Sequence, residues 1–247
     1  MGDFKKMMGK YEETFNLRRD KTSLVLTARG VFDEQASIIR NDIDLSPQGK
    51  EKKLEALKTE VGEGLLKTFG EKIGEHKKAV VAASVEAEKI LNKPHLAPHS
   101  DKLKSFEREY DKLKVDLMLG TRPQDSVKAL REFISKQDDP YFTDVIVKEF
   151  PGLISSVLDT AGPEKDSYKI EMRGLLNIAR ENGITEEKRK AADVHESLKD
   201  AFTQKPFLEK DMVLDNVSAI FGNKIARYAN DPEAYFRIES SQEDGDE

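Results

Sequence analysis

The sequence contains no cysteine, and this absence excludes several kinds of chemistry at once. Disulfide bonds, thiolate metal sites and a cysteine nucleophile are all ruled out. A chain without thiols suits a reducing compartment. No apolar run approaches the roughly 20 residues that a membrane-spanning helix needs, and residues 1–10 lack the hydrophobic stretch of a signal peptide. We therefore expect a cytoplasmic protein with no membrane partner.

Motifs for catalysis and cofactor binding are also missing. Residues 162–165 lack the preceding strand and the second glycine of a phosphate-binding loop, and no Gly-x-Ser-x-Gly pattern occurs. His95 and His99 have the spacing of a helical zinc pair, but Pro94 and Pro98 prevent that helix. Polar linker histidines are the simpler interpretation. We expect a protein that is not an enzyme, with no catalytic residue, cofactor or metal.

The charge pattern does not favour nucleic-acid binding. Charged residues make up 36% of the chain and the net charge is −6, whereas dedicated nucleic-acid binders usually carry a basic face. The basic clusters at residues 50–53 and 188–190 lie next to glutamates, which is typical of solvated helix faces. Any phosphate contact should be weak, non-specific and sensitive to salt.

Residues 46–91 read as one long, charged, amphipathic helix. Ser46 can cap its start and Pro47 suits its first position. Apolar residues recur at three- and four-residue steps and predict a narrow seam that must lie against another helix, from this chain or from a partner. This seam comprises Leu54, Leu57, Val61, Leu65, Phe69 and Ile73.

Four glycines, from Gly62 to Gly74, interrupt this long helix, and each costs about 0.5–1 kcal/mol relative to alanine. They indicate either a close backbone approach or bend, or a helix broken into two. Residues 31–45 read as a preceding helix, and the short link at residues 44–47 predicts an antiparallel hairpin. The sequence leaves open whether residues 22–28 form a strand or a helix, and we favour the helix.

The remaining chain reads as a series of shorter helices. Residues 92–100 contain two prolines and mark a domain boundary. The next helix carries Leu103, Phe106, Tyr110, Leu113 and Leu117, and we expect it to pack back on the long helix. Further breaks are expected at residues 123, 138–140, 150–151, 161–163, 183–185, 205–206 and 231–232.

These patterns predict an all-α fold with a long N-terminal hairpin and a compact bundle of short helices. The expected divisions are a docking segment at residues 1–30, a hairpin arm at 31–99, a helical bundle at 100–238 and an acidic disordered tail at 239–247.

Residues 43–54 (Ile-Asp-Leu-Ser-Pro-Gln-Gly-Lys-Glu-Lys-Lys-Leu) resemble the hairpin of small helical structural and accessory proteins of tailed phages. In that family a helix, a Leu-Ser-Pro/Glu-Gly-Lys turn and a long Lys/Glu helix recur, and the match extends over about residues 31–91. The resemblance implies a virion or assembly component, located in the host cytoplasm or the virion. The chain differs from simple scaffolding proteins in its substantial C-terminal half and its acidic end.

Three functions remain open at this point. The first is a non-enzymatic assembly or adaptor protein that uses its arm to engage a protein partner or a second copy. The second is a monomeric regulator or inhibitor of a host or phage protein. The third is a weak nucleic-acid-associated protein. Burial separates the first two, because a self-assembling arm leaves its seam exposed in the monomer and a monomeric binder covers it internally.

Overall fold

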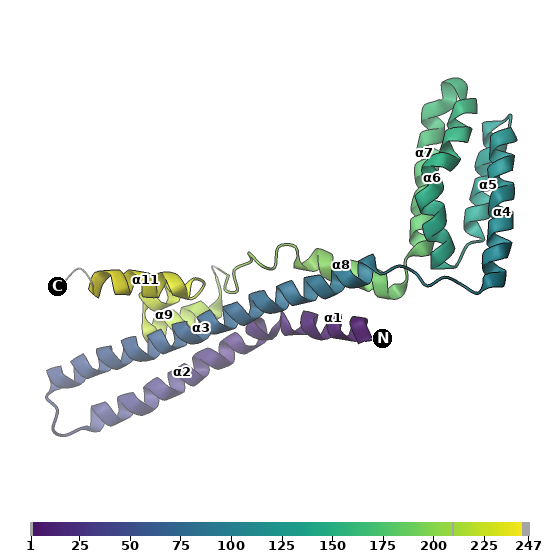
Figure 1. The fold of residues 1–247 in the computed structure, drawn as a ribbon. Helices are drawn as coiled ribbons and strands as arrows, with labels where there is room; N and C mark the ends of the chain where they lie inside the picture. The colour runs from purple at the N-terminus through teal and green to yellow at the C-terminus, as the bar shows by residue number, and fades with distance from the viewer. Residues whose placement is uncertain (1, 209, 244–247) are drawn as a thin grey trace. The chain divides into compact units, whose positions relative to one another are not determined.

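The computed structural model describes residues 2–208 and 210–243, and it is 83% helical with no strand among the residues described. The expected all-α fold is therefore confirmed. The chain divides into two compact units (Figure 1). The hairpin unit combines residues up to Lys89 with residues from Ala191 onward, and the bundle unit is Ile90–Lys190.

The hairpin unit is built on one continuous long helix. Helix α3 (Pro47–Asn92) runs through all four glycines without a break and follows α1 (Gly2–Glu13) and α2 (Asn16–Asn41). The Ser46 hydroxyl accepts a hydrogen bond from the Gly49 backbone N–H at 3.1 Å, which confirms the expected cap. Figure 1 shows α2 and α3 as the two antiparallel arms of the hairpin.

A bend separates α1 from α2 at residues 14 and 15. The buried Thr14 hydroxyl donates to the Tyr11 carbonyl oxygen at 2.6 Å, a local bond that competes with regular helix geometry. Residues 22–28 lie within α2, so the helical alternative holds for them.

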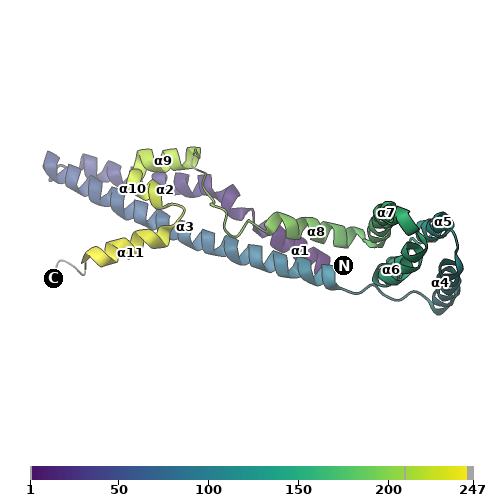
Figure 2. The same cartoon turned by 90° about the horizontal axis from the view of Figure 1, so that it is seen from above.

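The C-terminal part of the chain returns to the hairpin (Figure 2). It contains α8 (Glu186–Leu198), α9 (Met212–Phe221), α10 (Asn223–Tyr228) and α11 (Pro232–Glu243). Apolar side chains from residues 207–235, which include α9 and α10, form one core cluster with those of α2 and α3, because neither arm can bury its apolar face alone. The cluster comprises Val25, Leu65, Leu66, Phe69, Phe207, Val213, Val217, Phe221, Ile225, Ala229 and Tyr235.

Residues 199–208 and 210–211, which lie between α8 and α9, are irregular, and Phe207 holds this part of the chain on the core. The Phe207 ring is 1% exposed and its centroid lies 4.8 Å from that of Phe69. Asn230 pairs with the Phe207 backbone at both ends: its Oδ1 accepts from the Phe207 N–H at 3.0 Å, and its Nδ2 donates to the Phe207 carbonyl at 2.9 Å. One buried side chain and two hydrogen bonds therefore fix the middle of a segment with no helix of its own.

The bundle unit packs four helices around an aromatic core. They are α4 (Ser100–Leu119), α5 (Pro123–Ser135), α6 (Pro140–Thr160) and α7 (Lys165–Gly183), with a short 3-10 helix at Gly162–Glu164. The Phe106 and Phe142 rings stack with centroids 4.3 Å apart. The apolar stripe of α4 belongs to this core together with α5, α6 and α7, so the expectation that it packs on the long helix is wrong.

The observed units differ from the expected divisions. No boundary falls near residue 30, because α2 is continuous from Asn16 to Asn41, and the residues expected as one bundle at 100–238 divide between both units. The amphipathic pattern of α9 predicts a buried face but does not say which surface covers it. Residues 239–243 of the expected tail belong to α11, and residues 244–247 lie outside the described residues.

A second difference concerns residues 150–151, where α6 continues instead of ending. The Pro151 ring is exposed, whereas Phe150 and Leu153 beside it are buried in the bundle core. Burial of these apolar neighbours outweighs the backbone hydrogen bond that proline cannot donate.

The α3 glycines give a matched test of the hairpin packing. A Cβ at Gly62 would lie 2.9 Å from Cγ1 of Ile225, whereas one at Gly64 would meet no atom within 4 Å. Gly64→Ala should therefore raise the free energy of unfolding by about 0.5–1 kcal/mol. Gly62→Ala should give no gain, because Ile225 must shift. Urea unfolding followed by circular dichroism measures both, and an equal gain at both positions would contradict the close packing of α3 and α10.

Candidate functional site: a cationic groove in the hairpin unit

The seam predicted on the long helix is an internal packing surface. Leu57, Leu65 and Phe69 are buried, and the remaining seam residues, Leu54, Val61 and Ile73, are partly buried. Leu65 and Phe69 belong to the hairpin core, and Val61 packs against it. The seam is thus covered by this chain, and the fully buried Leu66 beside it was not predicted.

A different surface of the hairpin unit has the shape of a binding site. A hollow of about 370 Å³ lies where the α1–α2 bend faces the end of α8 and the segment that follows it. We call this hollow the cationic groove. Its lining consists of Tyr11, Thr14, Phe15, Leu17, Arg18, Lys21, His76, Ser197, Leu198, Ala201, Gln204, Lys205, Pro206 and Leu208.

The groove combines an apolar floor with exposed apolar side chains at its rim. Leu17 and Leu198 are 4% and 6% exposed, so they belong to the packed interior. Phe15 and Leu208 are 36% and 65% exposed and come from the two opposite walls. Large apolar side chains left in water around a hollow are typical of a contact surface.

His76 of α3 joins the two walls. Its Nδ1 lies 2.8 Å from the Thr14 carbonyl oxygen, and its Nε2 lies 3.4 Å from the Ala201 carbonyl oxygen. The Tyr11 and Ser197 hydroxyls, one from each wall, lie 3.3 Å apart. Polar contacts across the floor therefore fix the width of the groove.

The charged side chains that line the groove are cationic among the residues that the structure describes. They are Arg18, Lys21 and Lys205, in a chain whose net charge is −6. Lys21 pairs with Asp211, whereas Arg18 and Lys205 form no ion pair with any residue that the structure describes. Two exposed cations on opposite walls are therefore available to a ligand.

Asp211 fixes the end of the segment that forms one wall. Its side chain accepts from the Val213 backbone N–H at 3.0 Å and so caps α9. Burial alone would raise the pKa of Asp211, but the hydrogen bonds from Lys21 and from the Val213 N–H outweigh it and hold the pKa below its ordinary value.

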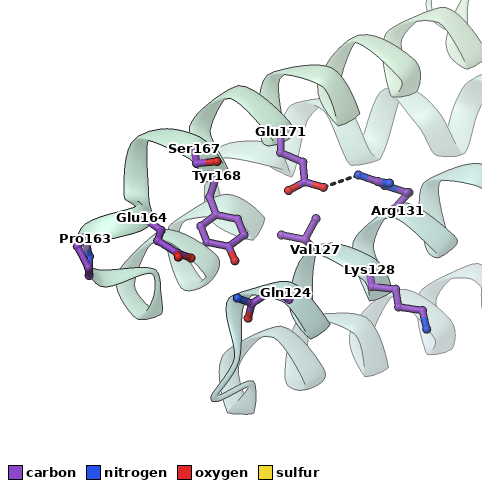
Figure 3. A pocket seen from close by; sticks show the side chains of 9 residues that line it. All are labelled: Gln124, Val127, Lys128, Arg131, Pro163, Glu164, Ser167, Tyr168 and Glu171. Atoms are coloured by element: carbon purple, nitrogen blue, oxygen red, sulfur yellow. Dashed lines mark hydrogen bonds and ion pairs between the residues drawn. The ribbon is translucent and has the colours of Figure 1, made fainter.

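A second hollow, of about 490 Å³, lies in the bundle unit between α5 and α7 (Figure 3). Arg131 and Glu171 pair across it, so that part of its charge is already satisfied. Burial, together with Glu164 and Glu171, raises the pKa of Tyr168. With Lys128 and Glu164 also in its lining, this hollow carries both signs of charge and selects a ligand less clearly than the cationic groove.

The two histidines considered for metal binding, His95 and His99, contact different residues. The His95 ring lies 3.2 Å from the Lys188 ammonium, and His99 lies 3.5 Å from Asp101. Within residues 2–208 and 210–243, no three histidine or carboxylate side chains gather as metal ligands do. Among the same residues, no helix is both long and apolar enough to span a membrane.

Comparison of the chain with protein-family models, with curated proteins and with solved structures gave no match.

The groove was not predicted from the sequence. Arg18 and Arg19 stand next to each other in the sequence, but no pattern connects them with residues 197–208. The available signal was local: Tyr11 and Phe15 beside two arginines, and Lys205 three residues before Leu208. Only the return of the C-terminal part onto the hairpin brings the two sets together.

Because the seam is internal, placing a charge in it should lower the stability of the protein without changing its molecular mass in solution. Leu57→Asp places a carboxylate at a site that is 6% exposed, so the free energy of unfolding should fall by roughly 2–4 kcal/mol. Ala56→Asp, at the exposed neighbouring position, should cost less than about 1 kcal/mol. Thermal melting and light scattering measure the two effects. A smaller species without a lower melting temperature would mean that the seam joins two copies.

The lowered pKa of Asp211 predicts a pH-dependent contribution to stability. Its carboxylate stabilises the folded state at a pH above the unfolded pKa of about 3.9, and this contribution disappears as the pH falls through the folded pKa. Asp211→Asn keeps the helix cap but removes the charge, so it should cost about 1–2 kcal/mol at pH 7 and progressively less below about pH 4.

Asp33→Asn is the matched control, since Asp33 pairs with Arg29 and both side chains are more than half exposed. It should change the free energy of unfolding by less than about 0.5 kcal/mol. Urea unfolding at several pH values compares the two variants. Equal losses that do not vary with pH would show that the Lys21–Asp211 pair does not stabilise the groove wall.

Proposed function

We propose that this chain is a non-enzymatic helical adaptor protein that acts through protein–protein contacts and binds its partner in the cationic groove. The observation that carries the proposal is the groove itself, where apolar and cationic side chains remain exposed around a buried apolar floor. Convergent exposed apolar groups with polar neighbours are the usual composition of a contact site.

Burial of the seam indicates which surface is left for the partner to bind. Since the hairpin already covers Leu65 and Phe69 internally, self-association through the seam is not part of the proposal. The internal cover supports a binder that meets its partner at another surface, either as an adaptor in an assembly or as a regulator of one protein. Both roles use the same contact.

The proposed biological setting rests on two features of the sequence. Residues 43–54 resemble the hairpin turn of tailed-phage helical proteins, and this resemblance alone supports a role in virion assembly. The lack of cysteine supports a reducing compartment such as the cytoplasm. Nucleic-acid binding is the second candidate, favoured only by the three cations of the groove.

Site-specific crosslinking in cells of the source organism tests the proposed contact. The photoreactive residue p-benzoylphenylalanine replaces Leu208 at the groove rim or Ile170 on α7, which is 76% exposed and is the control. We expect a discrete protein adduct, identified by mass spectrometry, at position 208 and not at 170. Equal adducts at both positions, or none at 208, would overturn the proposal, and an adduct with nucleic acid would favour the second candidate.

A further inference from the structure

We infer that the cationic groove binds an acidic peptide segment, extended in shape and anchored by one apolar side chain. This inference rests on the proposed function, because it specifies the chemistry of the partner that the groove accepts. Three features of the groove lead to it: the sign of its charges, the placement of its exposed apolar side chains and the anchoring of one wall by Phe207.

The charges select an anionic ligand that reaches both walls. Arg18 lies on the α2 wall and Lys205 on the wall formed by the segment after α8. Both are exposed, and neither has an ion pair among the described residues. A carboxylate near each would form a charge-assisted hydrogen bond, and the part of the lining that the structure describes holds no carboxylate to repel it. The ligand should therefore carry negative charges on both sides of its centre.

The apolar side chains select one anchor between those charges. Phe15 and Leu208 face the hollow from opposite walls above the buried Leu17 and Leu198. A hollow of about 370 Å³ is at the small end of the roughly 300–1,000 Å³ range of ligand sites, so it takes a few side chains rather than a folded domain. One leucine or phenylalanine of a peptide would cover both rim residues.

A nucleic acid fits the same features less well. Phosphates follow each other at every nucleotide, so single-strand grooves carry a continuous track of cations. This groove offers only two unpaired cations among the described residues, and both its floor and its rim contain leucines. A peptide uses the charges and the apolar surface together.

The wall that carries Lys205 and Leu208 is attached to the hairpin core through Phe207. Phe207 lies between them in sequence, and its ring is buried against Phe69. Asn230 holds the Phe207 backbone through two hydrogen bonds. An anchored wall reduces the conformational entropy that binding must remove, which favours binding of a short segment.

A displayed peptide library tests the inference on the whole chain. Random peptides displayed on yeast are selected against the purified protein, and the selected sequences are measured as fluorescein-labelled peptides by anisotropy. We expect Asp- and Glu-rich peptides with a central Leu or Phe. Their affinity should fall about tenfold or more in the double variant Arg18→Glu/Lys205→Glu, and several-fold when NaCl rises from about 0.05 M to about 0.5 M.

The matched control is the double variant Lys52→Glu/Lys53→Glu, which changes the net charge equally at exposed positions of α3 outside the groove. It should bind the acidic peptides as the wild-type chain does. Leu208→Asp should weaken the same peptides, because it removes an apolar rim residue and repels their charge. Circular dichroism confirms that each variant is folded.

The outcomes separate this inference from the proposed function. Selected peptides that are neutral or basic, yet lose affinity in Leu208→Asp, would overturn the acidic ligand and keep the groove as a protein contact. Equal weakening by both charge-reversal variants would show that only the net charge matters, and would also overturn it. Selection of no peptide would count against both, and tight binding of a labelled oligothymidylate that depends on Arg18 and Lys205 would replace the peptide by a nucleic acid.

Discussion

The fold depends on the need to cover one helix of 46 residues, α3, whose apolar residues no single partner helix can bury. Apolar burial stabilises by about 25 cal/mol per Å² removed from water, so an uncovered stripe of this length is costly. Helix α2 supplies Val25 to the shared core, and most of the other partners of Leu65 and Phe69 come from residues 207–235. The C-terminal helices are therefore part of the hairpin and not an attached module.

The cationic groove is the place where this cover is incomplete. The bend at Thr14 turns α1 away from the line of α2, and the opposite wall has no helix among the described residues 199–208 and 210–211. Apolar side chains on both walls therefore remain exposed to water. His76 contacts both walls, and Phe207 anchors one of them against Phe69. The same packing that closes the core thus leaves an open and ordered surface beside it.

Local signals predicted the helices well, and long-range pairing was not predictable. The Ser46 cap and most proline-marked breaks depend on neighbours within a few residues, so one sequence contains them. Which helix packs on which apolar face depends on how well the side chains of the two surfaces fit together, and this fit is not visible in a periodic pattern. The apolar stripe of α4 therefore packs on α5–α7 and not on the long helix. Pro151 lies inside α6 because its apolar neighbours are buried. The groove forms where residues 11–21 lie next to residues 197–208, and no periodic pattern in the sequence predicts this long-range contact.

In the sequence, the bundle unit is inserted between the two parts of the hairpin unit, and this affects the order in which the two cores can form during synthesis. At about 5–20 residues per second, the ribosome makes α3 well before Phe207 and α9 exist. Residues 90–190 can close their own core as they emerge, because that core is contiguous in sequence. Leu66 and Phe69 lack the part of their cover that comes from residues 207–235 until those residues are made, so the nascent chain carries exposed apolar surface during that interval.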